Sequence, residues 1–284
     1  MIDILIKSFS RLDVTIQSVK NLRKFFTGRI VIADSSSHVD DYFKKQMIFY
    51  DVEFYKLDYN IGLSAGRNFL ISQVKENKFL LLDNDFFVMS IEDIEKMCVI
   101  MDHTDAVIVG GLLWDKGTIH PRYYSGYFSY ESEIILNIYN SKETFKKCYK
   151  GIQFYECRFC QNFMLGDRQK FNKFNIKWNE KLKLMEHEDF FIRIPSNLKI
   201  IELPDIFVEH YPSLPTNNNP RKYSGWNNII CDQQYNSFRH NVVHKRLLKK
   251  LYGYKNDFFT CRENVVYDWR NGFPTLPFLH KSLN

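Results

Sequence analysis

The 284-residue sequence lacks any apolar run approaching the roughly 20 residues that a membrane-spanning helix requires. Its opening, Met1 to Ile6, is too short an apolar run for a signal peptide and has no basic leader. Taken as a full native chain, it is therefore expected to be cytoplasmic. A chain trimmed of a membrane anchor would look the same.

Cysteines and repeated segments are also scarce. The six cysteines do not have the spacing of a disulfide framework, and Cys157-x-x-Cys160 lacks the second pair of a zinc site, so ordinary thiols are expected. The sequence has no internal repeat and no low-complexity linker. Its length suits one large domain, placed at residues 1–215, with an appendage at 216–284.

Acidic residues are absent from Gln233 to Asn256, where basic and apolar residues are interleaved. This pattern predicts a basic amphipathic helix. The helix either packs on the domain through its apolar stripe or lies on an anionic membrane surface, which would place the protein at the inner face of a membrane. The net charge of +6 is mild, and no nucleic-acid partner is expected.

Strand and helix patterns alternate through the first 110 residues, which predicts an α/β fold with a mostly parallel central sheet flanked by helices. Residues 111–215 are less regular. Strands are expected at residues 2–7, 29–33, 52–57, 79–82, 106–109, 122–139, 163–165, 199–203 and 206–208, helices at 11–26, 39–50, 63–75, 91–101, from 168 and at 188–194, and a loop at 212–220.

The triplet Asp83-Asn84-Asp85 follows the apolar run Phe79 to Leu82, which is typical of a strand buried on both faces. In an extended backbone its two carboxylates would point to the same side, at the strand end where α/β folds bind ligands. Two buried carboxylates are costly unless a cation neutralises them, so the triplet indicates a divalent ion that carries a diphosphate. The alternative is ordinary turn chemistry.

Several further features come at expected strand ends or helix starts. They are Ser8-Phe9, Asp34, Gly62 to Asn68, Glu186 to Asp189, and Glu209-His210. The runs Ile32-Ala33-Asp34, Ala65-Gly66-Arg67-Asn68, Asp83-Asn84-Asp85 and Asp189-Phe190-Phe191 together resemble inverting glycosyltransferases of the GT-A (nucleotide-diphospho-sugar transferase) fold, in particular the β-1,4-N-acetylgalactosaminyltransferases of the ganglioside-synthase type.

This resemblance extends from Ile2 to Tyr211. It implies a nucleotide-binding half at residues 1–110 and an acceptor and catalytic half at 111–215. The resemblance does not reach the tail, where the basic pattern alone predicts a helical extension packed on the same domain. It also implies that Asp85 binds the metal directly, that Asp83 contacts the metal through water or the ribose, and that His210 is a third ligand. Mn²⁺ accepts both oxygen and imidazole ligands and is the expected ion, with Mg²⁺ second.

The nucleotide side of the site is implied by the same resemblance. Asp34 would accept a hydrogen bond from the uracil imide, or alternatively cap the following turn. Arg67 and Asn68, at a helix start, would bind phosphate; the alternative for Arg67 is a surface ion pair. Ser8, Phe9, Gly62 and Asn84 complete the expected cofactor-binding residues.

Asp189 is the expected general base, with Glu188 beside it as the second catalytic candidate. An inverting transfer needs one carboxylate to take the proton of the acceptor hydroxyl. The alternative for Asp189 is a charge at a helix start. Trp178 and Trp226 could stack on a sugar ring or pack in the core.

The resulting hypothesis is a metal-dependent inverting transferase that moves a sugar from a UDP-sugar donor to an oligosaccharide or glycolipid acceptor. N-acetylgalactosamine is the first expectation, with N-acetylglucosamine and galactose open. One alternative is a sugar nucleotidyltransferase, although Ser8-Phe9-Ser10-Arg11 lacks the glycine-rich phosphate loop of those enzymes. Another is a non-catalytic glycan-binding relative. The acceptor and the oligomeric state are left open.

Overall fold

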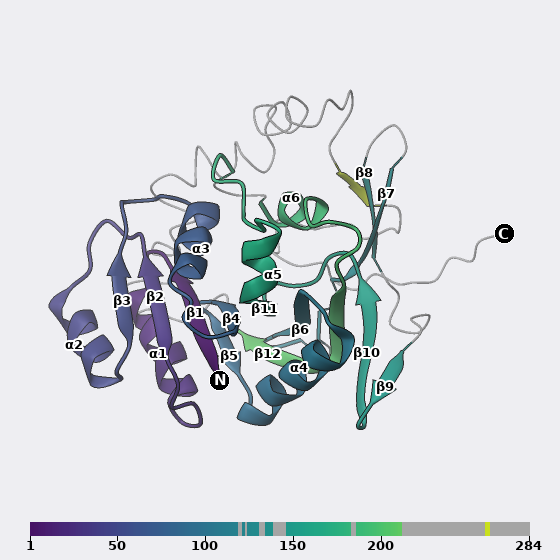
Figure 1. Cartoon of the computed structure of the whole chain (residues 1–284). Helices are drawn as coiled ribbons and strands as arrows, with labels where there is room; N and C mark the ends of the chain where they lie inside the picture. Colours follow the sequence, from purple (N-terminus) through teal and green to yellow (C-terminus); the bar gives the residue numbers. More distant parts are fainter. Residues whose placement is uncertain are drawn as a thin grey trace.

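The computed structural model describes residues 1–118, 121–122, 124–130, 134–138, 146–182, 186–211 and 259–261 (Figure 1). The expected loop at 212–220, Trp226 and the basic helix at 233–256 lie outside these residues, as does most of the predicted C-terminal extension. Within the described part of the chain, no helix is long and apolar enough to cross a membrane.

The first half contains every helix and strand that the sequence predicts there. Its strands are β1 Ile2–Ser8, β2 Ile30–Asp34, β3 Glu53–Lys56, β4 Lys78–Asp83, β5 Phe86–Val88 and β6 Ile108–Asp115, and its helices are α1 Leu12–Leu22, α2 Asp41–Phe49, α3 Leu63–Ser72 and α4 Ile91–Thr104. Side-chain caps begin two of these helices: Asp40 accepts from the backbone N of Phe43 at 2.7 Å, and Ser90 from that of Asp93 at 3.2 Å.

The second half adds mostly strands. They are β7 Gly126–Tyr130, β8 Ile134–Ile138, β9 Lys147–Tyr149, β10 Ile152–Cys157, β11 Met164–Asp167, β12 Ile200–His210 and β13 Phe259–Cys261, with helices α5 Arg168–Lys173 and α6 Glu186–Ile192. The two strands expected at 199–203 and 206–208 are one strand, β12, with a shift of register between Leu203 and Phe207. The short β5 and the β9–β10 hairpin were not predicted.

The main sheet has the strand order β3-β2-β1-β4-β11-β6-β12-β10-β9, with β5 paired to β12. The strands β1 to β4 are parallel, and β12 is parallel to β6. Because β11 runs antiparallel to both β4 and β6, those two strands share a direction. The carboxyl ends of β4, β6 and β12 therefore lie at one edge of the sheet, where α/β folds bind ligands.

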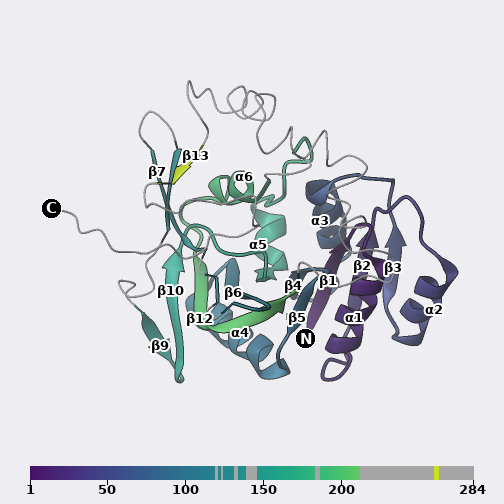
Figure 2. The same cartoon turned by 180° about the vertical axis from the view of Figure 1, so that it is seen from behind.

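Helices cover both faces of this sheet, as Figures 1 and 2 show. In β1, β2 and β4, even-numbered residues, such as Ile4 and Leu80, pack in a core with α1, α2 and α4. Odd-numbered residues, such as Leu5 and Leu81, pack in a second core with α3, α5 and α6. Burial on both faces explains the unbroken apolar runs of these strands and confirms the predicted α/β class.

Candidate functional site

The carboxylates of Asp83-Asn84-Asp85 do not point to the same side, contrary to the sequence expectation. β4 ends at Asp83, a turn occupies residues 84–85, and β5 begins at Phe86. Because the backbone turns within the triplet, the Asp83 side chain contacts α3, whereas the Asp85 side chain contacts His210 at the end of β12. The two acids therefore belong to separate polar networks.

Asp85 lies between two cationic side chains. Its Oδ2 accepts from Arg11 Nη1 at 2.6 Å and lies 3.3 Å from His210 Nε2. Its backbone oxygen accepts from the backbone N of Tyr211 at 3.0 Å, which ties the turn to the end of β12. Burial alone would raise the pKa of Asp85, but His210 and Arg11 outweigh it and hold the pKa well below its ordinary value.

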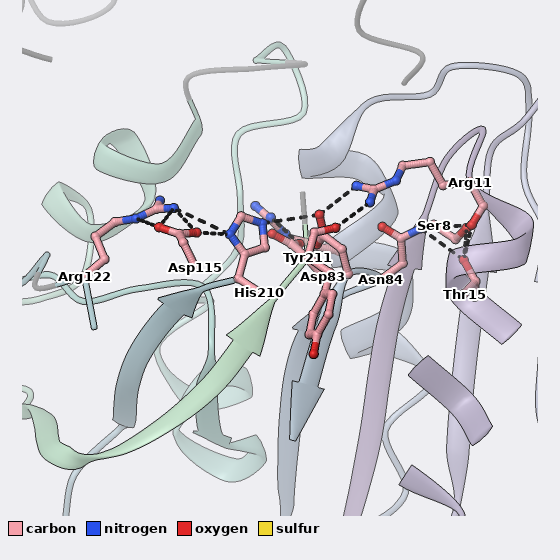
Figure 3. A network of polar contacts seen from close by, with 11 residues as sticks. Ser8, Arg11, Thr15, Asp83, Asn84, Asp115, Arg122, His210 and Tyr211 are labelled. Atoms are coloured by element: carbon pink, nitrogen blue, oxygen red, sulfur yellow. Dashed lines mark hydrogen bonds and ion pairs between the residues drawn. The ribbon is translucent and has the colours of Figure 1, made fainter. Parts of the chain in front are cut away.

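The other side of the His210 ring contacts Asp115, the last residue of β6, and Figure 3 shows the resulting chain of polar contacts. His210 Nδ1 lies 2.5 Å from Asp115 Oδ1, and Arg122 contacts both oxygens of Asp115. Burial alone would lower the pKa of His210, but Asp85 and Asp115 raise it to about 9. Asp115 in turn has a lowered pKa, because His210 and Arg122 outweigh its burial.

Asp115 and Arg122 were not predicted from the sequence. The strand before Asp115 was expected to end ahead of Gly110-Gly111, because paired glycines usually mark a turn. In the structure both glycines lie within β6, where close packing leaves no room for a side chain. A Cβ atom on Gly110 would stand 2.6 Å from Cys160 Sγ, and one on Gly111 would stand 2.7 Å from Phe163 Cε1. If the two glycines had been interpreted as sites of close packing, the predicted strand would have continued to Asp115. Asp115 would then have been recognised, like Asp83, as an acid at a strand end.

The side chains at the Asp85–His210 contact provide only part of a site for a divalent ion. A carboxylate oxygen and an imidazole nitrogen face each other there, and Mn²⁺ accepts both ligand types. Two cationic groups contact this carboxylate in the structure, which shows that the position attracts positive charge. Among the described residues no three His, Cys, Asp or Glu side chains gather as a metal site. Asp83, which was expected to contact the metal through water or to contact the ribose, pairs with Arg67.

Arg67 binds carboxylates rather than presenting its guanidinium at the surface. It is fully buried, donating from Nη2 to Asp83 Oδ1 at 2.9 Å and from Nη1 to Glu186 Oε1 at 2.6 Å. Burial alone would lower the pKa of Arg67, and the two carboxylates raise it. The phosphate contact expected for Arg67 is therefore not the contact observed. The ion pair considered as its alternative is present, but it is buried and joins β4 to α6.

Asn68 likewise contacts other parts of the fold, and its phosphate contact stays a prediction. Its Nδ2 donates to the Trp178 backbone oxygen and to Glu180 Oε1, both at 2.9 Å, and its Oδ1 accepts from the Trp178 backbone N at 2.8 Å. The amide therefore fastens the segment before α6 to α3. Trp178 itself is buried and stacks on Phe190 with ring centroids 3.9 Å apart, which is the core role considered for it.

The two glycines of the run Gly62 to Asn68 are needed for different physical reasons. Gly62 begins α3 with a φ of 95°, a conformation that favours glycine. Gly66 lies under the side chain of Lys7, because a Cβ atom there would stand 2.2 Å from Lys7 Cε. Lys7 is itself buried and donates to Ser35 Oγ at 2.8 Å; its burial lowers its pKa to about 8.

At the end of β2, Asp34 caps the following turn. It is fully buried, and its two oxygens accept from the backbone N of Ser36 at 2.8 Å and from Ser36 Oγ at 2.9 Å. This is the alternative considered for Asp34, and the uracil contact stays a prediction. Phe9 is partly exposed nearby, with its ring 6.1 Å from that of Tyr59.

Ser8 and Asn84 both contact Thr15 of α1, as Figure 3 shows. The Ser8 and Thr15 hydroxyls lie 2.9 Å apart, and Asn84 Nδ2 donates to Thr15 Oγ1 at 3.0 Å and to the Arg11 backbone oxygen at 3.3 Å. Both side chains are buried. They anchor α1 to the ends of β1 and β4, and the nucleotide contact expected of them stays a prediction.

The two candidate bases on α6 have different surroundings. Asp189 is fully buried, and its Oδ2 accepts from Arg193 Nε at 2.9 Å. Glu188 is partly exposed and accepts from the Tyr124 hydroxyl at 2.5 Å. A base has to reach the acceptor hydroxyl, so the exposed surface of Glu188 counts in its favour. The charge at the helix start, considered as the alternative for Asp189, is also present.

The sheet has the mostly parallel strands and the shared carboxyl edge of an α/β fold that binds ligands at this edge. The family model described as glycosyl transferase family 2 matches residues 5–173, more than half of the chain, and the chain belongs to this family. Its fold is the GT-A fold, as the sequence resemblance predicted.

Among curated proteins, the chain is 25% identical over 222 residues to β-1,4 N-acetylgalactosaminyltransferase 1 of Rattus norvegicus. It is 24% identical over 226 residues to β-1,4 N-acetylgalactosaminyltransferase 2 of Mus musculus. These matches cover 74% and 76% of the chain but only 39% and 40% of the two relatives, so the chain spans well under half of their length.

Among solved structures, the chain is similar to S. aureus TarS, with a TM-score of 0.54 and 14% identity over 75% of this chain and 37% of that one. It is also similar to GalNAc-T7 in complex with UDP, GalNAc and Mn²⁺, with a TM-score of 0.62 and 13% identity over 90% of this chain and 53% of that one. At these identities the likeness establishes the fold alone.

Proposed function

We propose that this protein is a metal-dependent inverting glycosyltransferase that moves a sugar from a UDP-sugar to a hydroxyl of a glycan acceptor. One observation carries the proposal: in a family 2 chain, Asp85 and His210 meet at the carboxyl edge of the sheet, where GT-A folds bind their ligands. The alternative of a sugar nucleotidyltransferase is disfavoured by family membership and by the absence of glycine from Ser8 to Arg11.

The donor that we propose first is UDP-N-acetylgalactosamine, because the curated relatives are named as N-acetylgalactosaminyltransferases. UDP-N-acetylglucosamine and UDP-galactose are the other candidates. The uracil ring would lie between Asp34, the last residue of β2, and the partly exposed Phe9, which follows Ser8, the register partner of Asp34 on β1. The Asp34 oxygens, which accept hydrogen bonds from the backbone N and the hydroxyl of Ser36, would then also accept one from the uracil N–H.

A carboxylate of α6 would act as the general base. It would take the proton of the acceptor hydroxyl as that oxygen attacks the anomeric carbon, while the bond from this carbon to the diphosphate breaks with inversion. Asp189 is the candidate from the sequence resemblance, and Glu188 is the candidate with exposed surface. Mn²⁺, with Mg²⁺ as the alternative, would be held by Asp85 and His210 and would neutralise the charge on the departing diphosphate.

The activity is tested by measuring UDP release from a panel of UDP-sugars, with Mn²⁺ and with EDTA. We expect release with UDP-N-acetylgalactosamine and Mn²⁺, and its loss in EDTA. Equal turnover in EDTA would overturn the metal role. The absence of hydrolysis or transfer with every donor, at protein concentrations that bind UDP, would favour a non-catalytic glycan-binding protein.

The base is tested with Asp189→Asn and Glu188→Gln, which keep side-chain size and remove the charge. We expect the variant of the true base to lose transfer by about 10²–10⁴-fold while its UDP affinity stays within about threefold of wild type. Tyr124→Phe is a matched control, since it removes only the hydroxyl that donates to Glu188. Loss of UDP binding in parallel with transfer would contradict a base role.

A further inference from the structure

The pairing of two strands in the sheet makes Asp115 and His210 neighbours. They are register partners on the parallel strands β6 and β12, and each is the last residue of its strand. Their side chains leave the sheet at the same edge, and His210 Nδ1 lies 2.5 Å from Asp115 Oδ1. The contact turns the opposite ring nitrogen, Nε2, toward Asp85 at 3.3 Å.

Asp115 is itself held in place from behind. Arg122 donates from Nε to Asp115 Oδ2 at 3.0 Å and from Nη2 to Oδ1 and Oδ2 at 2.6 Å. The Arg122 backbone pairs with Leu113 in an isolated bridge, with its N donating to the Leu113 oxygen at 2.6 Å. With only 7% of its side chain exposed, Asp115 has little freedom to leave the imidazole.

We propose that Asp115 is the positioning residue of the candidate metal site, holding His210 so that Nε2 is presented to a divalent ion bound at Asp85. A carboxylate behind a metal-binding histidine fixes the ring orientation and makes the ligand more basic, and its loss typically costs 10- to 100-fold in metal affinity. This inference rests on the proposed metal role of His210. It goes beyond that role because it assigns a function to Asp115 and to the pairing of β6 with β12.

The competing explanation is that Asp115 only stabilises the fold through its pair with Arg122. Metal affinity distinguishes the two, because a purely structural pair would change the unfolding temperature without changing Mn²⁺ binding by the folded protein. The test measures free Mn²⁺ by electron paramagnetic resonance in the presence of a fixed, saturating UDP concentration. It compares wild type with Asp115→Asn, Asp115→Ala and His210→Ala.

We expect Asp115→Ala to bind Mn²⁺ 10- to 100-fold more weakly and Asp115→Asn to lose less, because the amide oxygen can still accept from Nδ1. Excess Mn²⁺ should restore transfer by Asp115→Asn. In nitrogen-15 spectra of the metal-free protein, the Nδ1–H signal of His210, assigned by its loss in His210→Ala, should disappear in Asp115→Ala. Glu202→Gln is the matched control: it removes the charge of a fully buried carboxylate of β12 away from the histidine and should leave Mn²⁺ affinity unchanged.

The outcomes separate the two levels of the proposal. If His210→Ala weakens Mn²⁺ binding and Asp115→Ala does not, the positioning role is overturned and the metal role stands. If His210→Ala binds Mn²⁺ like wild type, the metal role of His210 is overturned and the inference falls with it. Should Asp115→Ala fail to fold, the Asp115→Asn variant decides through its Mn²⁺ affinity.

Discussion

At the scale of single residues, Arg11 is the least expected member of the site. It lies in the loop before α1, where its side chain makes no cap hydrogen bond to the helix. Its guanidinium instead donates to Asp85 Oδ2 at 2.6 Å and to the Tyr211 backbone oxygen at 3.0 Å. Arg11 and His210 therefore contact the same oxygen of Asp85, and a divalent ion bound there, as proposed, would compete with Arg11.

Replacing Arg11 by Gln should raise the affinity for Mn²⁺ in the absence of nucleotide. A hydrogen bond to a charged group contributes about 1.5–3 kcal/mol, so removing this competitor should strengthen Mn²⁺ binding by roughly 10- to 100-fold. Isothermal titration calorimetry on the metal-free protein measures the change. Arg23→Gln is the control, because Arg23 ends α1 but donates to backbone oxygens of Phe26, Gly28 and Tyr50. Weaker Mn²⁺ binding by the Arg11 variant would contradict the competition.

At the scale of elements, α3 connects the two halves of the domain. Ser64 donates to the Leu182 backbone oxygen at 2.5 Å, Arg67 pairs with Glu186 of α6, and Asn68 binds Trp178 and Glu180. The segment before α6 is thus fastened along one side of α3, and α6 carries both candidate bases. The polar residues of the motif Gly62–Asn68 join elements of the fold, and the phosphate contact expected of Arg67 and Asn68 stays a prediction.

Asn68→Ala separates these two roles. If Asn68 fastens the segment, the variant loses its amide contacts and should be destabilised by about 1–3 kcal/mol, with UDP affinity within about threefold of wild type. Urea unfolding and UDP titration measure the two quantities. Ser72→Ala is the matched control on the same helix, since its hydroxyl bonds only locally, to the Phe69 backbone oxygen. A normal stability with a large loss of UDP affinity would restore the phosphate contact predicted from the sequence.

At the scale of the whole molecule, a buried acid makes stability depend on pH. Glu202 of β12 is fully buried, and its Oε1 accepts from Ser125 Oγ at 2.7 Å and from the Tyr155 hydroxyl at 2.6 Å. Burial raises the pKa of Glu202 to about 7 in the folded protein, against an ordinary value of 4.5. Because the folded pKa is the higher one, its contribution to stability is complete below pH 4.5 and is lost as the pH rises to about 7.

Glu202→Gln should remove this pH dependence. In wild type, this group should lower the free energy of unfolding by about 3 kcal/mol as the pH rises from its unfolded pKa to its folded pKa, at 1.36 kcal/mol per pKa unit. The variant should therefore gain stability relative to wild type as the pH rises through this window. Chemical unfolding at several pH values measures it. Glu156→Gln, an exposed acid on the neighbouring strand β10, should change little, and equal curves for Glu202→Gln and wild type would contradict the prediction.

The amino-acid sequence by itself determined the α/β class and most of the elements, because apolar periodicity and strand-end polar residues are local properties. It also identified Asp85 and His210, which the structure brings together. The resemblance to N-acetylgalactosaminyltransferases pointed to the family that the comparisons establish. These features are readable because each depends on a few neighbouring residues.

Only the tertiary structure decided which side chains meet. Asp83 and Asp85 are two residues apart in sequence, but their side chains contact different partners, because a turn falls between them. Asp115 and His210 are far apart in sequence but adjacent in space, because β6 and β12 pair in parallel. Strand order and register are set by burial across the whole sheet, and no local pattern encodes them. For this reason the positions of the candidate ligands could be predicted, but not the partners that hold them.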